Sequence, residues 1–122
     1  MAFHFIEMKI TKVKENYLFR RAYNRAASFV GPYTVVYIMK NRGLGIRLGI
    51  TTGKKIGKAV CRNRARRVIT AAFRECISNI SGNFDIIIVA RPKILNVKSN
   101  CVAQSLKKLF TDAGISAVEK NG

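Results

Sequence analysis

A cationic helix with one apolar stripe dominates this sequence, in the stretch GKKIGKAVCRNRARRVITAAFR from Gly53 to Arg74, which contains no acidic residue. From Lys58 onward the apolar residues recur at helical spacing: Cys61, Ala65, Val68, Ile69, Ala72, Phe73, Cys76 and Ile77. The arginines of this stretch fall off that stripe. The chain must therefore bury one face of the helix in a core and leave the other to solvent or to a polyanion.

Length and charge favour one folded, nucleic-acid-binding domain. The chain has 122 residues, 48% of them hydrophobic, a formal net charge of +17 and a pI of about 10.6. We expect a single domain over 1–122, with an ordered core over about 12–112 and flexible ends. A domain this basic repels itself unless it is bound to a polyanion, so RNA or DNA is the expected partner. A membrane surface is disfavoured, because no basic helix has a bulky, exposed apolar face.

Periodicity and turn residues predict the other elements in chain order: a helix over 14–27, a strand over 33–40, a second strand over 44–52 antiparallel to the first, the basic helix, a strand over 84–90 and a helix over about 98–111. The near-continuous apolar run FDIIIVA is typical of a central strand. The expected fold class is α+β, a small central sheet with packed helices in the order α-β-β-α-β-α. The unit over 44–90 can be parallel, and a frayed tail is expected over 112–122.

Cysteines and hydrophobic runs give no sign of a metal site or a membrane anchor. Cys61, Cys76 and Cys101 form no CxxC pair, so zinc is not expected, and their odd number fits a reducing compartment. The N-terminus does not resemble a signal peptide, and the uncharged run over 26–39 is too short to span a bilayer. We therefore expect a cytoplasmic protein. His4, the only histidine, has no visible partner and is interpreted as a bystander.

Catalysis by the protein itself has little support. A metal nuclease needs clustered carboxylates, but the six acidic residues are scattered: Glu7, Glu15, Glu75, Asp85, Asp112 and Glu119. Asp85 begins a predicted strand, where it could cap the strand or pair with an arginine. The stretch Gly49–Gly53 has three residues between its glycines, where a P-loop needs four, and the loop Gly53–Gly57 has one residue too many for the GxxG clamp of KH domains. Its simpler use is to place backbone donors and two lysines near a phosphate.

Polyanion binding is the function that the residues themselves support. Seven cations lie within 14 residues: Lys54, Lys55, Lys58, Arg62, Arg64, Arg66 and Arg67. If about six of them meet phosphates, the log–log salt slope of binding would be roughly −4 to −5. In the predicted first helix, Phe19 and Tyr23 share a face and are flanked by arginines. They either belong to the core or form a ledge on which unpaired bases stack.

The segment KKIGKAVCRNRARR resembles the signature of the bacterial ribonuclease P protein subunit, in which a lysine-lysine-glycine turn leads into an arginine-asparagine-arginine helix. The similarity extends to Phe19 and Tyr23, to the strand before the signature, to FDIIIVAR and to SLKKLF. It covers roughly Lys14 to Phe110. It also implies a left-handed strand-helix-strand crossover, against the usual right-handed rule.

The resemblance implies a role in which a catalytic RNA removes the 5′ leader from precursor tRNA with Mg²⁺ held mainly by the RNA, and the protein assists without being the catalyst or binding a cofactor. It implies a monomer in a 1:1 ribonucleoprotein. Contacts to the catalytic RNA, or to metal and phosphate beside it, would come from Lys54, Lys55, Arg62, Asn63, Arg64, Arg66 and Arg67, with Lys58 adding charge. Phe19, Tyr23 and Tyr37 would line the leader cleft.

The sequence differs from the family pattern at two places, and two other functions were considered beside it. The first ten residues are more apolar than expected for the family, and Lys58 stands where a small polar residue is common. A ribosomal or structural RNA-binding protein would share the size and charge, but the signature and the aromatic pair favour the ribonuclease P subunit. A metal nuclease in its own right is opposed by the scattered acids.

Overall fold

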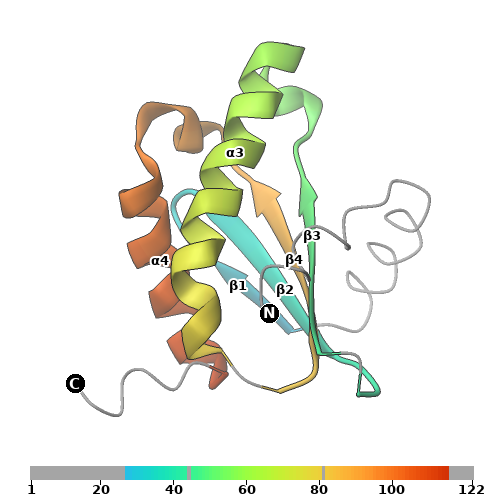
Figure 1. Ribbon diagram of the computed structural model, residues 1–122. Coiled ribbons are helices and arrows are strands. Elements are labelled where there is room, and N and C mark those ends of the chain that lie inside the picture. Colours follow the sequence, from blue (N-terminus) through green and yellow to red (C-terminus); the bar gives the residue numbers. More distant parts are fainter. Residues whose placement is uncertain (1–26, 44, 81, 116–122) are drawn as a thin grey trace.

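The structure is a computed structural model that describes residues 27–43, 45–80 and 82–115. Its elements are β1 (Ala27–Val30), β2 (Thr34–Lys40), β3 (Ile46–Thr51), α3 (Ala59–Cys76), β4 (Phe84–Ala90) and α4 (Ser99–Ala113), joined by the 3-10 turns η1 (Lys54–Ile56), η2 (Ile77–Asn79) and η3 (Pro92–Asn96). Figure 1 shows both helices on the same face of the sheet. The predicted α+β class is confirmed, whereas the single domain over 1–122 extends past these residues and stays a prediction.

The sheet has the strand order β1-β2-β4-β3. Strand β2 is antiparallel to both β1 and β4, and β3 is parallel to β4. The predicted strands β2 and β3 do run in opposite directions, but they are not neighbours, because β4 lies between them. The apolar run of β4 accounts for this position. Its residues Ile86, Ile87 and Ile88 are all buried, which requires cover on both faces and neighbours at both edges.

The parallel unit β3-α3-β4 crosses over with the unusual hand. In Figure 1 both strands point upward, β4 lies to the left of β3, and α3 runs downward in front of the sheet. A right-handed crossover seen from the helix side would move to the right, so this connection is left-handed. The resemblance implied this hand, whereas the residue pattern did not.

The core lies between the helices and one face of the sheet. Helix α3 contributes Ala65, Ile69, Ala72 and Phe73, and α4 contributes Val102, Leu106, Leu109 and Phe110, all of them buried as their helical spacing predicts. The rings of Phe73 and Phe110 meet edge to face, with centroids 6.0 Å apart and an interplanar angle of 83°. These contacts hold α3 against the fold along the stripe that the sequence marked, so its opposite face stays outside.

Two boundaries differ from the sequence prediction. Ala27, assigned to the end of a helix over 14–27, is the first residue of β1, a strand that the prediction omitted because four residues show too little periodicity. The predicted frayed tail from Asp112 is wrong at its start. Helix α4 continues to Ala113, Gly114 adopts a left-handed φ of 81°, and Ile115 is 8% exposed against the core. The rest of the helix over 14–27, and His4, lie outside the described residues.

Candidate nucleic-acid interface

A short turn presents two lysines in front of the basic helix. In η1, Ile56 is buried and holds the turn against the core, while Lys54 and Lys55 are exposed. Gly57 then adopts φ 127° and ψ −153°, a conformation that residues with a side chain rarely adopt. Arg62 donates a hydrogen bond from Nη1 to the Gly57 carbonyl oxygen over 2.6 Å. Turn and helix are thereby joined into one surface.

The predicted RNA-binding residues lie on the outer side of α3 or in the turn before it. Asn63, Arg64 and Arg67 are exposed, and Arg62 and Arg66 are half-buried along the side of the helix. Lys58 is exposed at the N-cap position, where the helix has no side-chain cap and no acidic residue in its first turn. The structure therefore brings together the eight residues predicted to contact RNA: Lys54, Lys55, Lys58, Arg62, Asn63, Arg64, Arg66 and Arg67.

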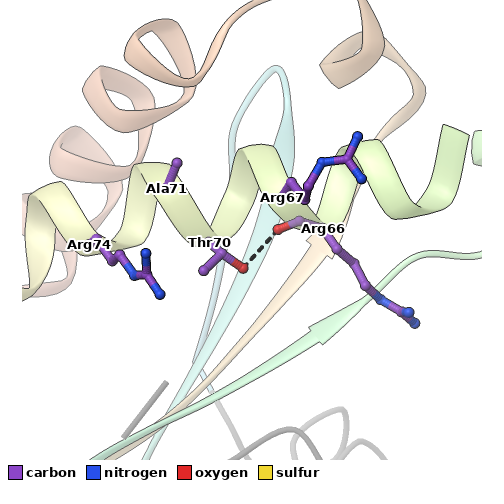
Figure 2. A pocket seen from close by; sticks show the side chains of 5 residues that line it. All are labelled: Arg66, Arg67, Thr70, Ala71 and Arg74. Carbon is purple, nitrogen blue, oxygen red and sulfur yellow. Dashed lines mark hydrogen bonds between the residues drawn. The ribbon is translucent and has the colours of Figure 1, made fainter. Parts of the chain in front are cut away.

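A shallow hollow of about 410 Å³ lies farther along the same helix. Figure 2 shows the residues that line it: Arg66, Arg67, Thr70, Ala71 and Arg74. The Thr70 hydroxyl donates a hydrogen bond to the Arg66 carbonyl oxygen over 2.8 Å. Sequence reasoning did not single out Thr70 and Ala71, because neither residue type indicates binding by itself. Their helical spacing, one turn after Arg66 and Arg67, would have placed them beside these arginines.

The second face of the sheet, opposite the helices, carries Tyr37. Val36 and Ile38 point to the core, so Tyr37 between them points the other way and is half-buried. The sheet register aligns Tyr37 with Ile87 and Ile87 with Gly49, which places a residue without a side chain in the same row. Of the predicted leader-cleft residues, Phe19 and Tyr23 lie outside the described residues, so only Tyr37 is placed by the structure.

A charged network fixes one end of this second face. The Asp85 carboxylate accepts hydrogen bonds from Arg47 Nε at 2.7 Å, from Arg47 Nη2 at 2.8 Å and from Asn41 Nδ2 at 2.9 Å. Asp85 is 6% exposed. Hydrogen bonding to Asp85 raises the pKa of Arg47, burial opposes this shift, and the negative charge of Asp85 adds to it. The expectation that Asp85 could pair with an arginine is confirmed, and this carboxylate is engaged by the fold rather than presented to a metal.

The remaining chemistry of the described residues is limited. No three His, Cys, Asp or Glu side chains gather in a metal-binding arrangement within 27–43, 45–80 and 82–115. The three cysteines are free thiols, and burial raises the pKa of Cys76 to about 11. In the part of the chain that the structure describes, no helix is long and apolar enough to cross a membrane.

Known proteins are similar to this chain in sequence and in fold. A family model described as Ribonuclease P matches residues 8–114. The ribonuclease P protein component of Thermoanaerobacter sp. (strain X514) is 41% identical over 103 residues, covering 84% of this chain and 88% of that protein. The ribonuclease P protein component of Clostridium acetobutylicum is 36% identical over 110 residues, covering 88% and 92%.

A solved structure of the Staphylococcus aureus RNase P protein superposes with a TM-score of 0.72 at 32% identity, covering 83% of this chain and 93% of that one. The residues 8–114 that the family model matches include the basic turn, α3 and the sheet described above. The chain therefore belongs to the family of ribonuclease P protein components, the protein subunits of the tRNA-processing endoribonuclease ribonuclease P.

Proposed function

We propose that this protein binds the catalytic RNA of ribonuclease P through the turn at Lys54–Ile56 and the outer side of α3. The observation that carries the proposal is the continuous cationic surface formed there, in which no acidic side chain lies between Lys54 and Arg74. Cations spaced along a helix meet successive phosphates and release counterions, which gives strong and salt-dependent binding. The buried face of α3 is occupied by the core, so only this outer side is available to RNA.

The second face of the sheet is proposed to hold the 5′ leader of precursor tRNA. Tyr37 supplies an aromatic side chain there, and Phe19 and Tyr23 are assigned to the same cleft by family resemblance. Stacking on aromatic rings tolerates any base, which suits an enzyme that processes many precursors. This face and the outer side of α3 lie on opposite sides of the sheet, so one small domain can contact the catalytic RNA and the substrate together.

Removal of the leader is proposed to be Mg²⁺-dependent and catalysed by the RNA. The most buried carboxylate of the described residues, Asp85, already accepts three hydrogen bonds from Arg47 and Asn41, so we assign the metal ions to the RNA. The protein assists by binding both RNAs and by placing positive charge beside the phosphates. We further propose that it acts in the cytoplasm, as a monomer in a 1:1 ribonucleoprotein.

Cleavage of precursor tRNA at low Mg²⁺ tests this function. The cognate catalytic RNA is assayed with and without the protein, and with the double variant Arg62→Ala/Arg66→Ala. A matched control is Lys107→Ala/Lys108→Ala, which removes the same charge from exposed positions on α4. We expect stimulation by the native protein and by the control, and its loss in the α3 variant. No stimulation, with RNA binding intact, would instead indicate a general RNA-binding protein.

The protein alone provides the second arm of this test. With Mg²⁺ and no catalytic RNA, it should leave precursor tRNA intact. Cleavage by highly purified protein that Asp85→Asn abolishes would show that the protein is itself a metal nuclease and would overturn the proposal.

A further inference from the structure

We propose that the turn after β2, with Lys40 and Arg42, binds phosphates of the distal part of the 5′ leader, where the leader extends past the second face of the sheet. The ligand is a single-stranded polyanion, and the contact is to its backbone rather than to its bases. The inference rests on the proposed function, because it takes the leader to lie on that face.

The turn lies at the end of the sheet opposite the surface assigned to the catalytic RNA. Figure 1 shows β3 running upward to the start of α3, with the connection from β2 at its lower end. Strand β3 has six residues, which span about 17 Å. A leader that leaves the catalytic RNA beside the turn at Lys54–Ile56 and follows the second face therefore reaches the other end of the sheet at Lys40 and Arg42.

A network of hydrogen bonds holds this turn in place. The backbone N–H of Asn41 donates to the Asn83 carbonyl oxygen over 3.0 Å, and its side-chain Nδ2 donates to the Gly45 carbonyl oxygen and to the Asp85 carboxylate, each over 2.9 Å. The backbone N–H of Gly45 donates to the side-chain oxygen of Asn83 over 2.9 Å. The cations on either side of Asn41 are thereby presented from a fixed backbone, which reduces the ordering cost when a strand binds.

The fold does not balance the charge at this end of the sheet. Lys40 and Arg42 are exposed, and within 27–43, 45–80 and 82–115 neither has an ion-pair partner. The carboxylate of the network, Asp85, is already bound by Arg47. The hydrogen bonds to Asp85 use two of the five N–H donors of the Arg47 guanidinium, whose side chain is 31% exposed. Arg47 thus offers further donors where the face meets the turn, while Lys40 and Arg42 supply uncompensated charge.

The two exposed cations differ in how they reach the second face. Ile38 points to the core, so Lys40, two positions later, starts from the helix side of the sheet. Its flexible side chain must pass round the end of β2 to meet a strand on the other face. Arg42 lies beyond the strand, in the turn itself, so the larger share of the contact is assigned to Arg42. Neither side chain needs to read a base, which suits an unpaired leader of any sequence.

Leader length separates this contact from the others in the complex. Holoenzyme is assembled from the cognate catalytic RNA and native protein, the variant Lys40→Ala/Arg42→Ala, or the control Lys107→Ala/Lys108→Ala, which removes equal charge from exposed positions on α4. Its affinity for precursor tRNA is measured over a series of unpaired leaders, from those that end on the second face to those that extend past it. Circular dichroism checks that the variants, all of them at exposed positions, are folded.

The native affinity should rise as the leader grows past the face, and Lys40→Ala/Arg42→Ala should lose that rise. On long leaders the loss should be roughly three- to tenfold, and the log–log salt slope should fall in magnitude by about 1.4, the value for two phosphate contacts on a single strand. Arg42→Ala alone should cost more than Lys40→Ala alone. Short leaders and the α4 control should behave as in the native complex. Uncharged methylphosphonate linkages in the leader extension should abolish the difference between native protein and variant.

The outcomes distinguish this inference from the proposed function. If the native holoenzyme shows no preference for precursor over mature tRNA, the assignment of the leader to the second face fails, and the distal site with it. If that preference is present but Lys40→Ala/Arg42→Ala keeps the native dependence on leader length, only the distal site is refuted. Equal losses for short and long leaders would place these cations against the catalytic RNA or the tRNA body and would also overturn the inference.

Discussion

The Arg47 guanidinium donates two hydrogen bonds to the Asp85 carboxylate, from Nε to Oδ1 over 2.7 Å and from Nη2 to Oδ2 over 2.8 Å. The two residues are opposite each other on the parallel strands β3 and β4. Their side chains lie on the sheet face that also carries Tyr37. Side chains alternate between the two faces of a strand, and Arg47 and Asp85 are the immediate neighbours of Leu48 and Ile86, which point to the core. The pair therefore ties β3, an outer strand of the described sheet, to the central strand on the face opposite the helices.

Breaking this pair should destabilise the fold. Arg47→Ala leaves Asp85, only 6% exposed, with Asn41 as its remaining partner, and we expect a loss of about 3 kcal/mol in the free energy of unfolding. Urea denaturation measures it. Asp85→Asn should cost less, because Arg47 is 31% exposed and can reach water. A double-mutant cycle with both changes should show coupling above about 1 kcal/mol, and additive effects would mean that the pair contributes little.

A side chain at Gly57, the residue before the N-cap of α3, should destabilise the fold. Gly57→Ala forces a residue with a Cβ into φ 127°, and we expect a loss of about 1–3 kcal/mol. Gly53→Ala is the matched control, because Gly53 has φ −85° and open space where the Cβ would lie. It should be neutral or slightly stabilising. Thermal denaturation of the two variants makes the comparison, and equal behaviour would contradict the role assigned to the Gly57 backbone.

Alkaline pH should weaken the fold through Cys76. This thiol is 1% exposed, and burial raises its pKa from 9.0 to about 11. Between these values the unfolded chain loses the thiol proton while the folded protein keeps it. Stability is therefore fully present below pH 9 and falls as pH rises toward 11, by roughly 2–3 kcal/mol.

The Cys76→Ala variant isolates this contribution. Its stability at neutral pH should be lower, because a small cavity replaces the sulfur, but its decline from pH 9 to 11 should be shallower than that of the native protein. Urea midpoints at several pH values give both slopes. Parallel slopes would show that other groups cause the alkaline loss.

Removal of the ring at Tyr37 should reduce discrimination between substrates. If the 5′ leader stacks on the second face of the sheet, Tyr37→Ala should lower the holoenzyme's affinity for precursor tRNA by about 1–3 kcal/mol and leave that for mature tRNA unchanged. Tyr37→Phe keeps the ring and should retain most of the preference. Equal losses for both RNAs would show that Tyr37 only supports the fold. Phe19→Ala is expected to act like Tyr37→Ala, and retained discrimination would assign Phe19 to the core.

Much of this protein was predictable because its local patterns agree with its long-range packing. The stripe from Ala65 to Cys76 is apolar at helical spacing, and the structure buries it as predicted. The run FDIIIVA is apolar at every position but one, and it became the central strand. In both cases burial is encoded residue by residue, so the sequence determined the elements, the core face of α3 and the cationic character of its outer side.

Other features depend on which distant segments meet, and the tertiary structure alone decided them. Strand β4 inserts between β2 and β3 because its two apolar faces and both of its edges need cover, an energetic preference that no local pattern of β2 or β3 records. The same insertion brings Asp85 to Arg47, 38 positions away. The residue pattern therefore encodes what must be buried and what must carry charge, whereas three-dimensional packing selects the partners that those residues find.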